Sequence, residues 1–214
     1  MITVTCFTFN PVQENTYVLH NEKGNAIIID PGCYFSAEQE TLSNHVLRTG
    51  LKPVQWLNTH CHFDHIFGAK WLGKTYGLEM YCHEAEQQIL ERGTQSALRF
   101  GLGFDNYTGP LHFLKEGDIV KLDDDELKVL FAPGHSPGSI CFYHAKQHFL
   151  IAGDVLFYES IGRTDLPSGN QQQLVNSIQQ QLYTLPDETV VYPGHGPSTT
   201  IGHEKNHNPY VRAV

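Results

Sequence analysis

The sequence predicts an α+β fold in which two β-sheets pack face to face with helices on their outer sides. Strand-like runs come first and helix-like runs follow in each half of the chain, an order typical of stacked sheet and helix layers. The length of 214 residues is enough for one well-buried core and short for two full domains. Polar side chains directly follow the ends of several strand-like runs. We therefore expect one domain spanning residues 1–214.

In the first half, the apolar pattern predicts four strands and one long helix. The helix covers residues 36–49, with Ser36 as its N-cap and Gly50 just beyond its end. A second helix is expected to begin near residues 67–69. The proline of the Asp-Pro-Gly run at residues 30–32 stops the third strand. The predicted strands are residues 3–9, 15–19, 26–29 and 54–58.

The second half repeats this order of elements. Its helix is a glutamine-rich stretch over residues 171–182. Residues 98–110 show no regular period, so we expect them to form a loop over the functional site. The predicted strands are residues 119–120, 127–131, 139–143, 148–152 and 189–192.

The charge balance and hydropathy exclude several classes of partner. The chain has 23 acidic and 14 basic residues, with a net charge of −9. An acidic surface repels phosphate backbones, so no nucleic acid partner is expected and an RNA-processing nuclease is disfavoured. No apolar run reaches membrane-spanning length, so no membrane partner is expected either.

The N-terminus and the cysteines indicate a cytoplasmic location. Residues 1–5 carry neither the basic nor the apolar part of a signal peptide. The five cysteines are odd in number and none belongs to a CxxC pair. This pattern is typical of reduced thiols in the cytoplasm.

One short segment carries most of the candidate chemistry. His60, His62, Asp64 and His65 fall within six residues, directly after a predicted buried strand. Alternate residues of an extended chain project to one side, so His60 and His62 can face one ion while the following turn directs Asp64 and His65 to a second position. Imidazole and carboxylate ligands suit zinc, and also iron or manganese. By the same alternation Cys61 points away, so we expect it to be a packed structural thiol.

Three further residues are candidate metal ligands that follow a predicted strand. His135, Asp154 and His195 each follow a predicted strand and have glycine or proline beside them, which is how a rigid scaffold presents side chains from loops at one rim. Asp30 also ends a strand, but we expect it to support a ligand or to form a turn. With Asp154 shared, the other candidates make two sets of three: His60, His62 and His135, then Asp64, His65 and His195.

The count of ligands favours catalysis over a structural role. Each of two ions would keep a coordination position for a shared water, the open position that catalytic sites need. Structural zinc sites are closed sets of four Cys or His ligands, so a non-catalytic metal-binding protein is the weaker alternative. The sequence therefore predicts a hydrolase with two divalent ions, zinc first and iron or manganese as alternatives.

The order of four short motifs resembles the metallo-β-lactamase superfamily. The motifs are HxHxDH at residues 60–65, GHSPGS at 134–139, GDVLF at 153–157 and YPGHG at 192–196. The resemblance implies a four-layer αββα sandwich, the metallo-β-lactamase fold. It also implies a dinuclear site made of the seven residues named above.

Within this superfamily, the chain is similar to the glyoxalase II-like hydrolases (hydroxyacylglutathione hydrolases). The similar segments are residues 58–62, 133–138 and 161–165. This similarity implies a thioester substrate such as S-lactoylglutathione, attacked at its carbonyl by hydroxide formed from the shared water. A thiolate leaves readily, so little acid catalysis is required. Asp64 is expected to be a ligand first, with a proton-relay role as the alternative.

The sequence offers three candidate residues for substrate binding, fewer than for metal binding. Arg163 falls where the resembled family places a basic residue near the substrate's carboxylate, although an ion pair with Asp165 is an equal alternative. Tyr158 and Tyr107 are candidates to line the pocket, although aromatic residues are more often part of the core. Full-length glyoxalase II carries a helical C-terminal extension that helps to bind glutathione, and the 19 residues after His195 are too few for it. Thioester cleavage is therefore predicted on more grounds than glutathione as the carrier.

Two other enzyme classes share the resemblance. Persulfide dioxygenases have this fold and the Gly-Arg-Thr-Asp string of residues 162–165, but hold one iron with two histidines and one aspartate, here His60, His135 and Asp154. β-Lactamases are exported enzymes. That activity is disfavoured because no signal peptide is expected here.

Overall fold

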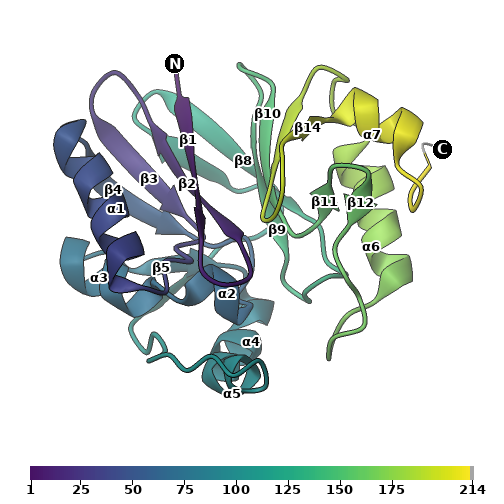
Figure 1. The fold of residues 1–214 in the computed structure, drawn as a ribbon. Coiled ribbons are helices and arrows are strands. Elements are labelled where there is room, and N and C mark those ends of the chain that lie inside the picture. Colours follow the sequence, from purple (N-terminus) through teal and green to yellow (C-terminus); the bar gives the residue numbers. More distant parts are fainter. Residues whose placement is uncertain (213–214) are drawn as a thin grey trace.

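The computed structural model describes residues 1–212, which form two six-stranded β-sheets with helices on their outer sides. Figure 1 shows the sheets side by side, with α1 and α3 on one flank and α6 and α7 on the other. The first sheet has the order β1 (Thr3–Phe9), β2 (Glu14–His20), β3 (Asn25–Ile29), β4 (Lys52–Leu57), β5 (Met80–Cys82) and β6 (Leu111–Phe113). The second has the order β14 (Thr199–Thr200), β13 (Val190–Pro193), β10 (Phe149–Gly153), β9 (Ile140–His144), β8 (Asp125–Phe131) and β7 (Ile119–Leu122). A separate hairpin pairs β11 (Leu156–Phe157) with β12 (Ser160–Ile161).

The helices connect the parallel strands of the first sheet and close the outer face of the second. The pairs β3–β4, β4–β5 and β5–β6 are parallel, and each needs a crossover, which a helix supplies. The helices are α1 (Ser36–Arg48), α2 (Phe63–Ile66), α3 (Ala69–Tyr76), the single turn η1 (Glu84–Glu86), α4 (Gln87–Glu91), α5 (Gly93–Leu98), α6 (Gln171–Ser177), the π-helical turn η2 (Ile178–Leu182) and α7 (Ile201–His207). None of the helices within residues 1–212 is long and apolar enough to span a membrane.

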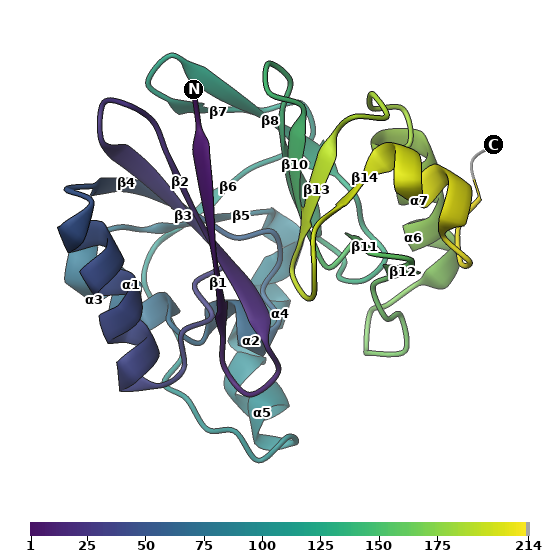
Figure 2. The same ribbon diagram turned by 45° about the horizontal axis from the view of Figure 1, so that its top comes forward.

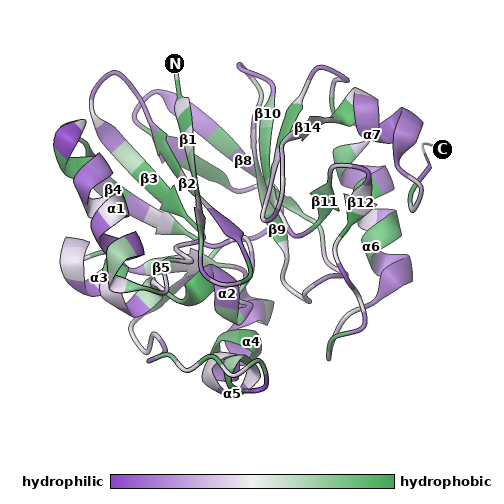
Figure 3. Cartoon of the chain, in the orientation of Figure 1, coloured by the Kyte–Doolittle hydropathy of each residue, from purple (hydrophilic) through white to green (hydrophobic). Residues whose placement is uncertain are grey.

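Strand β3 illustrates why the centre of the molecule is apolar on both faces of a sheet. Its side chains alternate, so Ala26 and Ile28 pack toward the helices while Ile27 and Ile29 pack toward the second sheet. All four residues are fully buried. In Figure 3 apolar colour is concentrated on inner strands such as β3 and β10, while α1 and α7 carry much polar colour.

Three apolar clusters correspond to the interfaces between the four layers. The cluster between the sheets joins residues such as Leu19 of β2 to Phe142 of β9. The cluster on the first sheet includes Leu42 of α1 and Leu72 of α3. A third cluster packs helix residues such as Leu174 of α6 onto the second sheet, and Figure 2 shows α6 and α7 on that outer side. This arrangement confirms the predicted four-layer αββα sandwich.

The predicted elements differ from the structure mainly at their ends. The predicted helix at residues 36–49 is α1, but its N-cap is Phe35 rather than Ser36. The cap forms because the Glu38 carboxylate accepts hydrogen bonds from the backbone N–H groups of Tyr34 and Phe35, at 2.7 and 3.0 Å. The helix predicted near residues 67–69 is preceded by the short α2, and the last turn of the helix predicted at 171–182 is the π-turn η2.

Candidate metal centre

The loops that leave several strands meet at one end of the sandwich, where Figure 1 shows α2 between the two sheets. From the first sheet, β4 leads to His60 and His62, and α2 carries Asp64 and His65. From the second sheet, His135 follows β8, Asp154 follows β10 and His195 follows β13. The structure therefore brings together side chains from both sheets that the sequence placed at strand ends. The convergence includes all seven predicted ligands.

The first group of side chains is His60, His62 and His135, whose ring nitrogens lie within 4.8 Å of one another. His62 Nδ1 and His135 Nε2 are only 2.9 Å apart. His135 Nδ1 lies 2.8 Å from the backbone oxygen of Arg163, so that N–H donates there and the Nε2 lone pair faces the group. Two such nitrogens need a proton or a cation between them. This group can therefore hold one metal ion.

The second group is Asp64, His65 and His195, whose ligand atoms also lie within 4.8 Å of one another. His195 Nε2 is 3.1 Å and His65 Nε2 is 3.7 Å from Asp64 Oδ2. His195 Nδ1 lies 3.1 Å from the backbone oxygen of Gln13. That contact directs the Nε2 lone pair of His195 toward Asp64 and His65.

Asp154 lies between the two groups and touches both. Its Oδ1 is 3.4 Å from His65 Nε2, and its Oδ2 is 3.5 Å from His135 Nε2 and 3.6 Å from His195 Nε2. Donor atoms about 2.1 Å from a tetrahedral metal ion lie about 3.4 Å from each other. The spacing around Asp154 therefore suits shared ligation better than direct hydrogen bonding.

Several buried polar atoms at the centre have no hydrogen-bond partner among the described residues, as expected of residues that bind metal ions. Within residues 1–212, the buried atoms without a hydrogen-bond partner include His60 Nε2, His65 Nε2 and Asp154 Oδ1. A buried polar atom without a partner carries a free-energy cost of about 1–3 kcal/mol. All three atoms face the centre, and a bound cation would satisfy them.

The outer nitrogens of the buried histidines are held by polar partners. Asp30 Oδ2 lies 3.1 Å from His65 Nδ1 and accepts a 2.6 Å hydrogen bond from Thr59 Oγ1. Thr59 Oγ1 in turn lies 3.1 Å from His60 Nδ1. Asp30 Oδ1 accepts from the Thr59 backbone N–H at 2.7 Å. Asp30 is therefore occupied in orienting two ligand rings, as the sequence predicted, although it also lies within reach of His60 and His65 as a third set of ligand atoms.

Burial and neighbouring charge set the protonation of this cluster. Burial and the neighbouring ring of His135 hold the pKa of His62 at about 3. Burial also favours the neutral ring of His65, but the carboxylates of Asp154 and Asp64 outweigh it and raise the pKa of His65 well above its ordinary value. Burial opposes ionisation of Asp154, and the charge of His65 overcomes it and holds the pKa of Asp154 well below its ordinary value. A bound cation would take the place of the proton on His65.

The first sheet fixes the loop that carries His195. An isolated bridge pairs Glu14 with His195, and the Asn15 backbone N–H donates to Gly194 O at 2.7 Å. The Tyr17 hydroxyl donates to Pro193 O at 2.6 Å. The start of β2 thus holds a loop of the opposite sheet in position.

Two buried glutamates at the centre were missed by the sequence analysis. Glu14 is fully buried, with Oε2 accepting from Thr16 Oγ1 at 3.0 Å and Oε1 3.8 Å from His65 Nδ1. Burial raises the pKa of Glu14 well above its ordinary value. Glu86 is also fully buried and accepts from the Cys61 N–H and the Ser136 hydroxyl. Neither residue lies in a motif, so the sequence holds no signal for them.

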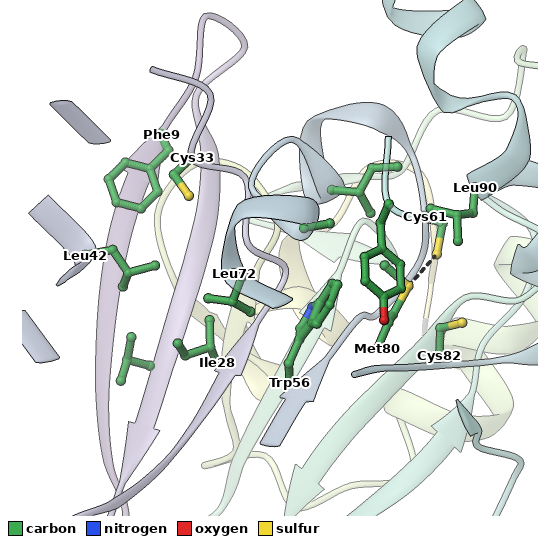
Figure 4. Close-up of a cluster of buried hydrophobic side chains, with 14 of the residues drawn as sticks. Phe9, Ile28, Cys33, Leu42, Trp56, Cys61, Leu72, Met80, Cys82 and Leu90 are labelled. Carbon is green, nitrogen blue, oxygen red and sulfur yellow. Dashed lines mark hydrogen bonds between the residues drawn. The ribbon is translucent and has the colours of Figure 1, made fainter. Parts of the chain in front are cut away.

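Cys61 points away from the centre, as its alternation predicted. Its side chain is fully buried and lies 4.0 Å from the sulfur of Met80. Figure 4 shows this contact within the apolar cluster that also contains Trp56 and Leu90. The neighbouring thiol of Cys82 and burial raise the pKa of Cys61, so it stays an uncharged thiol.

A family model for the metallo-beta-lactamase superfamily matches residues 9–195. The match runs through all seven candidate ligands and most of both sheets. This chain belongs to the metallo-beta-lactamase superfamily. The family predicted from the four motifs is therefore confirmed.

Relatives within the superfamily cover the chain almost end to end. It is 37% identical to the protein named hydroxyacylglutathione hydrolase GloC of Haemophilus influenzae, over all of this chain and 97% of that one. Among solved structures it resembles the BLEG-1 B3 metallo-beta-lactamase, with a TM-score of 0.90, 37% identity, and coverage of 98% of this chain and 99% of that one. It also resembles TTHA1623 in a di-iron-bound form, with a TM-score of 0.88, 37% identity, and coverage of 97% and 100%.

A cavity of about 880 Å³ opens beside the ligand cluster and shows where the substrate candidates lie. Arg163 lines it, and its guanidinium also forms a two-point ion pair with Asp165 at 2.7 and 2.8 Å. The predicted ion pair with Asp165 is therefore present, and a contact between Arg163 and the substrate stays a prediction. The predicted loop at 98–110 begins one residue later, because Leu98 ends α5. Its residues Arg99 and Phe100 line the cavity as well.

The two tyrosines lie elsewhere. Tyr158 is outside the residues that line this cavity, because its ring stacks on His203 of α7 with the ring centroids 5.0 Å apart. The prediction that Tyr158 lines the pocket is therefore wrong for this cavity. Tyr107 packs edge-on against Trp56, with the centroids 5.0 Å apart, and belongs to the core, which was the stated alternative.

Proposed function

We propose that this chain is a hydrolase with two divalent metal ions that cleaves thioesters such as S-lactoylglutathione. The observation that carries the proposal is the position of Asp154, whose carboxylate oxygens lie 3.4–3.6 Å from histidines of both groups. A shared carboxylate between two sets of three ligands is suited to two ions side by side. The relative named hydroxyacylglutathione hydrolase supports the choice of thioester.

The metal ions are proposed to be zinc, iron or manganese. Imidazole and carboxylate ligands are compatible with all three, and the structural neighbour in a di-iron-bound form supports iron. Bound divalent ions supply Lewis acidity and a hydroxide nucleophile at neutral pH.

The protein's own residues hold the reacting groups in place. Asp30, Gln13 and the Arg163 backbone oxygen orient three ligand rings through their outer nitrogens. Phe63 and Phe157 line the cavity next to the cluster and give the substrate an apolar wall there. The ligand atoms of Asp64, His65 and His195 lie within 4.8 Å of one another, which supports a ligand role for Asp64.

The overall reaction adds water across the bond between acyl carbon and sulfur. The carbon–sulfur bond breaks, the acyl group leaves as a carboxylic acid, and the thiolate takes up a proton to become a thiol. Because a thiolate is a good leaving group, the reaction requires no buried acid beside the sulfur.

The proposed location is the cytoplasm. All five cysteines are free thiols, and four of them are buried. This supports a reducing compartment.

Metal analysis and a substrate panel on the purified protein test the proposal. We expect two metal ions per chain and turnover of S-lactoylglutathione. Asp154→Ala should lose metal and reduce kcat/KM at least about 100-fold, because the shared ligand is gone. Asp124→Ala, which removes an exposed carboxylate paired with Lys23, is the matched control and should keep both properties.

The same metal analysis, with two further substrates, distinguishes thioester hydrolysis from persulfide oxidation and from β-lactam hydrolysis. Oxygen uptake with glutathione persulfide, one iron per chain and no thioester turnover would replace the proposal with a dioxygenase. Turnover of a chromogenic cephalosporin in place of thioesters would favour β-lactam hydrolysis, the activity named for one structural neighbour.

A further inference from the structure

The cavity beside the ligand cluster has an arginine-bearing wall that faces the site. Ile89, Arg92, Ser96 and Arg99 all line the cavity and are separated by three or four positions. Arg92 joins α4 to α5 and Arg99 directly follows α5, and both have right-handed helical backbone angles. The spacing therefore places these side chains on one side of the segment. The wall therefore presents two guanidinium groups toward the substrate.

These two arginines have no ionic partner in the protein. No carboxylate within residues 1–212 lies within 4.0 Å of Arg92 or Arg99, whereas Arg163 across the cavity is paired with Asp165. Both unpaired arginines are exposed at the cavity. In a chain with a net charge of −9, two free cations beside one cavity attract an anionic ligand.

A pair of aromatic rings links Arg99 to the ligand cluster. Phe63 follows the ligand His62 directly, and its ring centroid lies 5.1 Å from that of Phe100. Phe100 is 53% exposed and lines the cavity next to Arg99. A substrate that reaches from the cluster to the arginines would therefore cross an aromatic surface with an uncharged part of its chain.

We propose that Arg92 and Arg99 bind the anionic groups of the substrate's thiol part, its carboxylates or phosphates, while the thioester lies at the ligand cluster. This inference rests on the proposed function and adds the class of carrier to it. Guanidinium groups form paired hydrogen bonds with carboxylate and phosphate oxygens alike. The shared chemistry is an anionic carrier thiol, and the cavity volume of about 880 Å³ is in the range of sites that enclose ligands of this size.

The test compares anionic and neutral thioesters in Arg92→Gln/Arg99→Gln. The substrates are S-lactoylglutathione, a lactoyl thioester of coenzyme A and the neutral lactoyl thioester of N-acetylcysteamine. We expect kcat/KM for the preferred anionic substrate to fall about tenfold, through KM rather than kcat, because the lost contacts are made equally in the ground and transition states. The neutral substrate should be unaffected, and whichever anionic substrate shows the loss identifies carboxylate or phosphate as the bound group.

Arg48→Gln/Lys52→Gln is the matched control. It removes two exposed positive charges from α1 and β4, outside the residues that line the cavity. It should leave all three substrates unchanged. Added salt should weaken the anionic substrate's binding to the wild type more than to the Arg92/Arg99 variant.

Failure of the inference is distinguishable from failure of the proposed function. Equal losses on neutral and anionic thioesters, or no loss on either anionic one, would overturn the inference while turnover itself continues. If the wild type cleaves none of the thioesters, the proposed function fails. The arginines are then tested by calorimetric binding of S-hexylglutathione, a thioether, and equal affinity of wild type and variant would overturn the inference.

Discussion

The carboxylate of Glu86 accepts a 2.5 Å hydrogen bond from the hydroxyl of Ser136. The same carboxylate accepts from the backbone N–H groups of Gly138 and Cys61, both at 2.7 Å. Cys61 stands between the ligands His60 and His62, and Ser136 follows the ligand His135. One buried side chain therefore connects the ligand loop of the first sheet to that of the second.

Glu86→Gln should destabilise the protein by about 1–3 kcal/mol. Burial raises the pKa of Glu86, and its three donors act against that rise. The amide of glutamine presents its NH₂ group to at least one of these donors, so a buried N–H or O–H loses its acceptor. Denaturant unfolding of the metal-free protein measures the loss.

Glu84→Gln is the control for this change. Glu84 lies in the same helical turn and is exposed, so its substitution should change the free energy of unfolding by less than about 0.5 kcal/mol. Glu86→Gln should also lower the metal content, because His60, His62 and His135 lose their common support. If Glu86→Gln and Glu84→Gln had the same stability and the same metal content, Glu86 would not connect the two loops.

Gly194→Ala should damage the centre through direct overlap. A Cβ atom at Gly194 would lie 2.1 Å from Asp154 Oδ1 and 2.7 Å from His65 Cε1, so the shared carboxylate has to move. A displacement of about 1 Å at a reacting centre can lower activity about 100-fold. We expect a loss of that size in kcat/KM together with lower metal content, measured by elemental analysis.

Gly196→Ala, two residues further along the same loop, is the control that strains the backbone without overlapping Asp154. A Cβ atom there meets no atom within 4 Å, but the backbone φ of +73° is unfavourable for alanine by about 1–2 kcal/mol. This variant should lose stability and keep its metal ions. If the two variants lose metal equally, strain in the loop rather than overlap with Asp154 is the cause.

The ligand set could be predicted from the sequence because each ligand is marked by residues close to it in the chain. Each strand with a clear apolar pattern ends at a loop. His135, Asp154 and His195 were recognised from that position, from the glycine or proline beside each of them, and from the cluster at residues 60–65. Parallel strands and stacked sheets then bring such loops to one rim, as the structure confirms. The strands that were missed, such as β5 and β12, have two or three residues, which is too short for a period to be visible.

The supporting residues could not be predicted because their partners are distant in the chain. Glu86 bonds to groups 25 to 52 residues away, and no short pattern reports such a pairing. Tyr158 was misplaced for the same reason, since the stacking partner that holds it is His203 of α7. Arg92 and Arg99 lie on a helical segment whose orientation depends on packing between layers.

His144 should make the metal-free protein less stable in mild acid. Its ring is buried in β9 and stacks on Phe149 with the centroids 4.9 Å apart. Burial lowers the pKa of His144 below its ordinary value of 6.5, and the nearby Asp125 only partly offsets this. A histidine with a lowered pKa binds its proton more weakly when folded, so stability is present above pH 6.5 and is lost as the pH falls below it.

His144→Gln should reduce this pH dependence. The measurement is the difference in unfolding free energy between pH 7.5 and pH 5.5, with chelator present throughout. His207→Gln, at an exposed position of α7, should behave like the wild type. An unchanged pH difference in His144→Gln would show that this ring does not contribute.

Removal of the metal ions should abolish hydrolysis without unfolding the chain. The three apolar clusters that join the four layers contain none of the seven candidate ligands, so the main source of folding free energy persists after chelation. The free centre then contains unpartnered buried atoms such as His60 Nε2 and Asp154 Oδ1, and we expect a lower melting temperature. Circular dichroism of the chelated protein, with an activity assay before and after metal is returned, checks both effects. If chelation unfolds the chain and no ester or thioester is ever cleaved, the centre has a structural role, because only a structural site supplies the folding free energy itself.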